Sequence, residues 1–162
     1  MRPMPKWAHA MRPYVKMTSA KDKALAYLNR FARTEKQVAQ YLSRKGFPQE
    51  EIAQTIAYLR EHRFLNDDVF AESYIQSRIR HCDGPFKIKQ LLLQKGISPD
   101  IADHLLKQSY PDDLQQEKIA SLVKKRLKGT KRVSRIERER VFRFIASRGF
   151  SRYVIIQVFN RL

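Results

Sequence analysis

The segment VAQYLSRKGF, residues 38–47, decides the fold, because the chain repeats its pattern twice. The later copies are IKQLLLQKGI at residues 88–97 and VFRFIASRGF at residues 141–150. In each copy, apolar side chains stand at the first, fourth and fifth positions, which is the spacing of one helix face. A basic residue and then a glycine stand near the end of every copy, at Gly46, Gly96 and Gly149. Each glycine is therefore expected to end a helix, and the apolar residue after it to pack back on the last turn.

Helix start signals complete three units of three helices. They include Ser or Thr caps, Gly–Pro and Pro–Asp pairs and an acidic first turn, and two of these starts have the capping-box pattern. The first and second helices of the units are expected to begin at Ser19, Thr34, Asp67, Gly84, Pro111 and Ser134. The third helices are expected to begin near Pro48, Pro99 and Ser151, with Pro48 and Pro99 at first-turn positions.

The sequence therefore predicts an all-α protein with three tandem three-helix repeats that form an elongated, curved helical array. The repeats are expected over residues 19–66, 67–110 and 111–162. Residues 1–18 are read as a basic, flexible N-terminal extension without an assigned function.

The composition points to a polyanionic partner. The 162 residues hold 33 Lys and Arg against 16 Asp and Glu, a formal net charge of +17. Nucleic acid is the leading candidate and an anionic membrane surface the second. No apolar run approaches the roughly 18 residues that a membrane span needs, and the N-terminus lacks the apolar core of a signal peptide. The single Cys82 cannot form an internal disulfide, which fits a reducing compartment, and the protein is expected in the cytoplasm.

The charge is unevenly distributed along the chain. Residues 1–66 hold 13 Lys and Arg against 5 Asp and Glu, residues 67–110 hold 6 against 6, and residues 111–162 hold 14 against 5. The densest basic run comprises Lys124, Lys125, Arg126, Lys128, Lys131, Arg132 and Arg135. An array with basic ends would attract a polyanion at two separated places. The alternative is that this run is only a solvated surface that aids solubility.

Direct reading of a base sequence is not indicated. The third helix of each unit follows a turn, as in a helix-turn-helix, but the three helices share no pattern of Asn, Gln or Arg on their outer faces. Five aromatic side chains could stack on bases, and most of them are expected in the core: Tyr27, Tyr41, Tyr74, Phe86 and Tyr153.

Catalysis is not expected. His81, Cys82 and Asp83 are the residue types of a nucleophilic triad, but adjacent residues near a helix end cannot converge as nucleophile, base and orienting group. Asp67 and Asp68 could hold a magnesium ion, yet an acidic helix start explains both. The histidines have no metal-ligand spacing, and no glycine-rich phosphate loop exists. No cofactor and no metal site are predicted.

The middle unit resembles the RecX family of recombination regulators. The matching residues are Leu65, Asn66, Asp67, Phe70, Ala71, Tyr74, Ile75, Arg78, Gly84, Ile88, Leu92, Lys95, Gly96 and Ile97. Asn66 stands where the family more often has Asp, and the outer units resemble the family through helical pattern and length. The resemblance implies an elongated helical protein that binds RecA filaments on single-stranded DNA, and we expect the protein to be a monomer. It implies a protein that restrains filament extension, ATP hydrolysis, strand exchange and SOS induction.

We expect cationic side chains to make the contacts with the filament and with DNA, with single-stranded DNA as the first candidate and double-stranded DNA as the second. The candidates are Arg33, Arg44, Lys45, Arg78, Lys87, Lys95, Lys124, Lys125, Arg126, Lys128, Lys131, Arg132 and Arg135. Phe70, Tyr74 and Ile75 have the helical spacing of core residues. The rival interpretation is a free-standing basic helical protein that binds nucleic acid without a recombinase partner.

Overall fold

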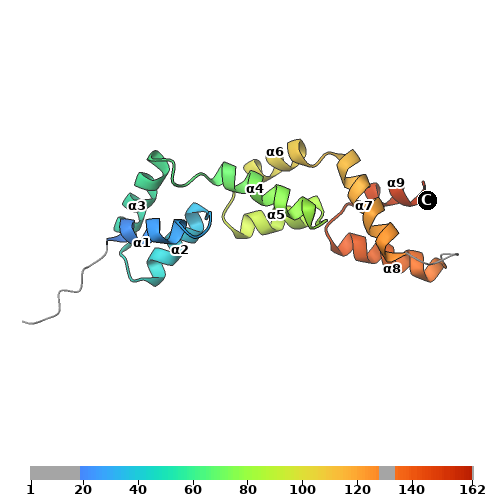
Figure 1. The fold of residues 1–162 in the computed structure, drawn as a ribbon, viewed down its shortest axis with the longest axis horizontal. Coiled ribbons are helices and arrows are strands. Elements are labelled where there is room, and N and C mark those ends of the chain that lie inside the picture. Colours follow the sequence, from blue (N-terminus) through green and yellow to red (C-terminus); the bar gives the residue numbers. More distant parts are fainter. Residues whose placement is uncertain (1–18, 128–133, 162) are drawn as a thin grey trace, which may run out of the picture.

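The computed structural model of the protein describes residues 19–127 and 134–161. These residues form nine helices and no strand. In chain order the helices are α1 (Ala20–Leu28), α2 (Glu35–Arg44), α3 (Gln49–Glu61), α4 (Asp67–Arg80), α5 (Pro85–Gln94), α6 (Pro99–Ser109), α7 (Asp112–Arg126), α8 (Arg135–Ser147) and α9 (Arg152–Phe159). Figure 1 shows them as an elongated row of three groups. The predicted all-α array of three-helix repeats is thus confirmed, while the N-terminal extension lies outside the described residues.

Capping boxes fix three of the helix starts. Ser19, Thr34 and Ser134 each accept a hydrogen bond from the backbone N–H three residues later, and the side chain of that later residue accepts from the cap's own N–H. The box at Ser19 uses an aspartate as its return partner. The hydrogen bonds from the backbone and side chain of Ser134 lower the pKa of Glu137. The prediction for Pro48 was wrong by one position, because this proline directly precedes α3 as its N-cap.

The three repeated glycines end helices in the predicted way. Gly46, Gly96 and Gly149 have φ values of +85°, +96° and +89°, the left-handed conformation in which a residue without Cβ is unstrained. At the first turn, Gly46 N–H donates to the Ser43 carbonyl at 2.9 Å and Phe47 N–H donates to the Leu42 carbonyl at 3.3 Å. This pair of bonds satisfies two of the carbonyl groups that a helix end leaves without partners.

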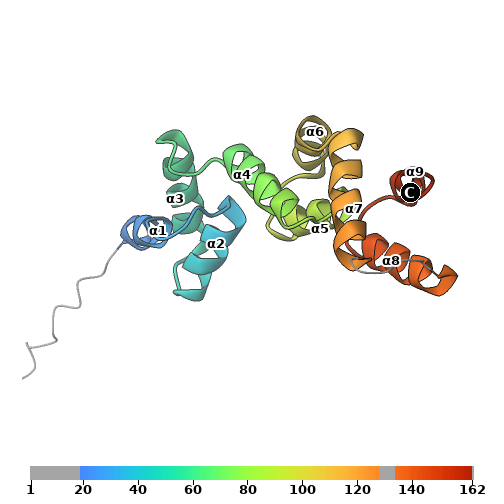
Figure 2. The same cartoon turned by 45° about the vertical axis from the view of Figure 1, so that its right-hand side comes forward.

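The buried apolar side chains form two cores among the described residues. The first belongs to α1, α2 and α3 and contains Ala20, Ala24, Val38, Leu42, Ile52, Leu59 and Leu65. The second is continuous from α4 to α9, and Tyr110 and Phe150 meet inside it edge to face at 6.2 Å. The second and third repeats therefore share one core, whereas the first repeat has its own. Figure 2 shows α1, α2 and α3 as a group beside the helices α4 to α9. The boundaries at residues 66 and 110 stay a prediction.

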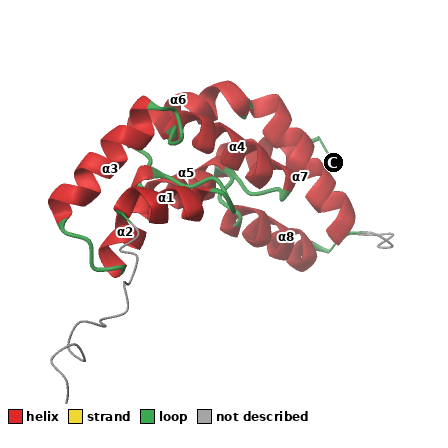
Figure 3. Cartoon of the chain, turned by 60° about the vertical axis from the view of Figure 1, so that its left-hand side comes forward, coloured by secondary structure: helices red, strands yellow, loops and turns green. Residues whose placement is uncertain are grey.

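Two joints of the same kind connect the repeats. In the first joint the end of α5 meets the beginning of α2, where the Thr34 hydroxyl donates to the Lys95 carbonyl at 2.6 Å. In the second joint the end of α8 meets the beginning of α5, where Gly84 N–H donates to the Arg148 carbonyl at 2.8 Å and Phe86 N–H donates to the Gly149 carbonyl at 3.1 Å. Each joint pairs helix-end carbonyls with donors at a helix start, which is also the favourable alignment of helix dipoles. Figure 3 shows the bend of the row that results.

The second joint predicts that alanine substitution destabilises the protein more at Gly149 than at Gly46. We expect Gly46→Ala to lower the free energy of unfolding by about 1–2 kcal/mol, the cost of a left-handed residue with a Cβ, since nothing lies within 4 Å of that Cβ. Gly149→Ala should cost clearly more, because its Cβ would lie 2.5 Å from the Lys87 backbone nitrogen. Urea denaturation of both variants measures the difference, and equal losses would contradict a backbone contact at this joint.

Candidate nucleic-acid and partner interface

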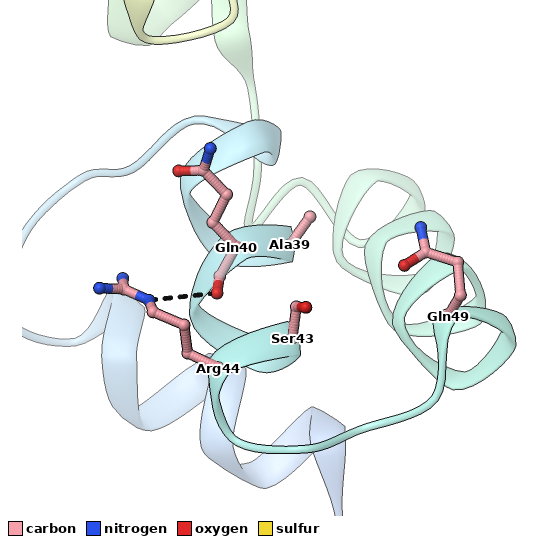
Figure 4. Close-up of a pocket in the computed structure, with 5 residues that line it drawn as sticks. All are labelled: Ala39, Gln40, Ser43, Arg44 and Gln49. Carbon is pink, nitrogen blue, oxygen red and sulfur yellow. Dashed lines mark hydrogen bonds between the residues drawn. The ribbon is translucent and has the colours of Figure 1, made fainter.

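The first exposed basic site lies at the C-terminal end of α2. We call Arg44 and Lys45 the α2 basic cluster; both side chains are exposed. Arg44 Nε donates to the Gln40 carbonyl at 3.3 Å, and Lys45 Nζ lies 5.6 Å from the ring centroid of Tyr41. Beside them an open depression of about 540 Å³ is lined by Ala39, Gln40, Ser43, Arg44 and Gln49 (Figure 4). The cluster therefore presents two cations next to a polar hollow on the outer repeat.

The second exposed basic site lies at the C-terminal end of α7. We call Lys124, Lys125 and Arg126 the α7 basic cluster; all three are exposed and occupy the last turn of the helix. The Arg126 guanidinium lies 4.0 Å from the ring centroid of Phe144, which holds it against the third repeat. Arg135, also exposed, is the first residue of α8. Lys128, Lys131 and Arg132 of the predicted run lie outside the described residues.

In the middle repeat, Arg78 and Lys87 each have an ionic partner within the chain. Both pair with the carboxylate of Asp83, whose side chain is only 1% exposed; the Lys87 Nζ to Asp83 Oδ1 distance is 3.0 Å. Arg148 of the third repeat approaches the same oxygen at 3.5 Å and donates to the His81 carbonyl at 2.7 Å. Asp83 therefore holds cations from two repeats together, a role that sequence reasoning missed because it considered Asp83 only beside His81 and Cys82. The signal available was its spacing, four residues ahead of Lys87.

The same region contains His81, Cys82 and Asp83, and the contacts of His81 and Asp83 do not form a triad. The His81 Nδ1 lies 2.7 Å from the Ser77 carbonyl, and the Asp83 carboxylate is bound by cations. Cys82 has a φ of +55°, at the turn that leaves α4. The side chains of His81 and Asp83 thus have separate partners, while Cys82 packs against the second core, an arrangement unlike that of a nucleophile, base and orienting group.

Two further candidate cations cover aromatic rings. Lys95 Nζ lies 5.0 Å from the ring centroid of Tyr74 and 5.9 Å from that of Phe70. The Arg33 guanidinium lies 4.8 Å from the ring centroid of Tyr27. Both side chains are half-buried, and the Nε atom of Arg33 is buried without a hydrogen-bond partner among the described residues. They are less available to a partner than the exposed cations of the α2 and α7 basic clusters.

The aromatic residues divide between packing and exposure. Tyr27 and Tyr41 stack on each other with their ring centroids 4.1 Å apart, and Tyr74 packs against the second core. Phe86 and Tyr153, in contrast, are 61% and 66% exposed. The expectation that most of the five belong to packed regions thus holds for three of them, and Phe86 and Tyr153 are the two that could meet a base.

Two acidic residues at the first joint, Asp67 and Glu35, accept hydrogen bonds from other parts of the chain. Asp67 Oδ1 accepts a hydrogen bond from the Glu35 backbone N–H at 3.0 Å. Glu35 in turn binds Arg60 through two hydrogen bonds of 2.7 and 2.5 Å. Within residues 19–127 and 134–161, no group of three or more His, Cys, Asp and Glu side chains is placed to hold a metal ion. Likewise, no described helix is long and apolar enough to cross a membrane.

Burial raises the pKa of Asp67, although the Glu35 N–H opposes this shift. A carboxyl group whose pKa is higher in the folded protein favours folding when protonated, and this contribution is lost as the pH rises through the folded pKa. Asp67→Asn keeps the hydrogen-bond acceptor without the charge. We expect it to be as stable as the wild type or slightly more stable at neutral pH, with the difference shrinking below the ordinary value of 3.8. Thermal unfolding across the acid range checks this, and a variant destabilised only at neutral pH would contradict it.

Comparisons with known proteins give a consistent result. Residues 20–59 match the family model of the first three-helix domain of RecX, and residues 66–106 match that of its second three-helix domain. Regulatory protein RecX of Clostridium perfringens strain SM101 is 33% identical over 137 residues, which are 81% of this chain and 62% of that protein. Regulatory protein RecX of Bacillus pumilus is 35% identical over 136 residues, 83% of this chain and 51% of that protein. The chain thus spans less than two thirds of the length of these relatives.

Solved structures extend the similarity to the third repeat. The crystal structure of RecX from Lactobacillus salivarius has a TM-score of 0.81 and 30% identity, covering 88% of this chain and 94% of that one. A second crystal structure of regulatory protein RecX has a TM-score of 0.79 and 25% identity, covering 99% of this chain and 79% of that one. The similarity therefore includes the order and arrangement of the helices along nearly the whole chain.

Proposed function

Since this chain belongs to the RecX family of regulatory proteins, we propose that it binds filaments of the RecA recombinase on single-stranded DNA and limits their extension. By doing so it lowers ATP hydrolysis, strand exchange and SOS induction. It acts by binding, as a monomer in the cytoplasm, and needs no bound cofactor.

The observation that carries this proposal is the separation of two exposed basic clusters. Arg44 and Lys45 lie in the first repeat and Lys124, Lys125 and Arg126 in the third, while Asp83 engages two cations of the middle repeat. A filament of protein on DNA offers phosphates along its axis and protein walls beside them. An elongated array whose two ends are basic and whose centre is internally neutralised suits such a partner, because charge contacts at two places add their binding energies.

The proposal is tested by ATP turnover of RecA on single-stranded DNA in the presence of this protein. We expect strong inhibition at amounts far below the number of protein-binding sites on the DNA, because a regulator of filament extension acts on few filament positions. Inhibition that appears only when the DNA is saturated would instead support the free-standing nucleic-acid-binding protein, which competes for phosphates.

A further inference from the structure

The surface between the second and third helices of a repeat differs sharply among the three repeats. Seven residues before and after the repeated glycine, the middle repeat has Lys89 and Asp103, whose side chains form an ion pair with Nζ and the carboxylate 2.7 Å apart. The first repeat has two alanines there, Ala39 and Ala53. The third repeat has Phe142 and Ile156. The same pair of positions thus carries a surface ion pair in the middle repeat and two large apolar side chains in the third repeat.

In the third repeat these apolar side chains form the floor of an open groove. The groove has a volume of about 380 Å³ and lies between α8 and α9. Phe142, Phe159 and Ile156 line it, and Ile156 is 47% exposed. Phe142 is half-buried and Phe159 is only 7% exposed, so the floor opens to solvent mainly through Ile156 and Phe142. An apolar floor in an open groove with a polar rim is typical of a binding surface.

Cations surround this floor. Arg135 and Arg138 line the groove, and the Arg152 guanidinium lies 6.0 Å from the ring centroid of Phe142. Glu139 is the acidic residue of the lining, and Arg143 approaches its carboxylate at 3.9 Å. Among the described residues, Arg135, Arg138 and Arg152 take part in no ion pair. The groove therefore combines an apolar floor with a positive rim.

We propose that this α8–α9 groove binds an acidic amphipathic helix of a partner protein. Its apolar side chains would lie on Phe142, Ile156 and Phe159, and its carboxylates would pair with the arginines at the rim, which is the helix-in-groove mode of recognition. The inference goes beyond the filament proposal, because it rests on the shape and charge of this groove alone.

Three contacts favour a protein ligand over a nucleic acid in the groove. Phe142 and Phe159 pack edge to face with their ring centroids 5.8 Å apart, and the Arg138 guanidinium lies 5.5 Å from the Phe159 ring centroid. Arg138 also donates to the Phe159 carbonyl at 2.5 Å. The rings thus already have neighbours on their edges and faces, whereas stacking of a base requires an open aromatic face. Aliphatic side chains need only the apolar floor.

The experiment measures binding of a fluorescent helical peptide of leucine and glutamate, patterned so that the leucines share one face. A scrambled peptide of the same composition and labelled oligothymidine are the companion probes. The variant Phe142→Lys/Ile156→Asp introduces the pair that the middle repeat carries at this position, and Arg135→Glu/Arg152→Glu reverses the rim. Arg140→Glu is the matched control, because Arg140 is an exposed cation of α8 outside the groove lining. Circular dichroism verifies that each variant is folded.

We expect the patterned peptide to bind the full chain at least about tenfold more tightly than the scrambled one, a difference of about 1.4 kcal/mol. Both groove variants should abolish this preference, and Arg140→Glu should retain it. Equal binding of the two peptides, or a preference that survives both groove variants, would overturn the proposal. So would loss of oligothymidine binding with unchanged peptide binding in the groove variants. Because RecA is absent from this assay, its outcome is independent of the filament proposal.

Discussion

Replacing Asp83 by alanine is expected to lower the free energy of unfolding by about 3 kcal/mol. Loss of one partner from a buried ion pair typically costs about 3–5 kcal/mol, because the remaining charge is left without compensation. The lower end applies here, since the side chains of Arg78, Lys87 and Arg148 are 27%, 41% and 32% exposed and keep some contact with water. The carboxylate itself is 1% exposed.

Denaturant unfolding of Asp83→Ala measures this loss, with Asp103→Ala as the matched control. Asp103 also pairs with a lysine, but its side chain is 59% exposed, so its removal should cost no more than about 1 kcal/mol. Similar, small losses in the two variants would show that Asp83 does not hold the second and third repeats together. The stability lost in Asp83→Ala should also appear in the unfolding of the shared second core, because Arg148 reaches the carboxylate from the third repeat.

The second large effect is expected for Lys124→Glu/Lys125→Glu in the α7 basic cluster. We expect binding to single-stranded DNA to weaken by at least about tenfold at low salt. The plot of log affinity against log salt should become shallower by about 1.4 units, if each lysine contacts one phosphate. Arg126 is left in place because it packs on Phe144. Fluorescence anisotropy with labelled oligothymidine over a salt series measures both quantities.

The matched control for this variant is Arg80→Glu/Lys107→Glu, which reverses two exposed cations of the middle repeat and changes the net charge equally. If only net charge governed binding, the two double variants would have the same salt dependence. The account predicts that the control retains nearly all of the wild-type slope, and a control as weak as the α7 variant would contradict a localised site.

Features that depend on neighbours along the chain were predictable from the sequence. A glycine at the end of an amphipathic segment predicts a left-handed turn, and Gly46, Gly96 and Gly149 all have one. The capping pair Ser134 and Glu137 likewise predicts the start of α8, since both hydrogen bonds lie within one turn. Such contacts span three to six residues, so their residue types and spacing contain the information.

Contacts between repeats were not predictable in this way. In the sequence, Arg78 and Lys87 look like cations that are available to a partner. Their pairing with a buried Asp83 could not be predicted, because this burial depends on packing against the segment at Arg148, far along the chain. The shared core of the second and third repeats has the same origin, since helical periodicity identifies an apolar face and not the element that covers it. The α8–α9 groove became recognisable only when the apolar floor and the arginines could be placed around one space.

The central claim is that the α2 and α7 basic clusters contact the same filament, and it is tested most directly by binding to RecA filaments assembled on single-stranded DNA. The variants to compare are Arg44→Glu/Lys45→Glu, Lys124→Glu/Lys125→Glu, their combination and Arg80→Glu/Lys107→Glu. The account predicts that each end variant weakens binding, that the combination binds more weakly than either, and that the middle variant binds like the wild type. End variants that bind with wild-type affinity, while the middle variant loses it, would contradict the account.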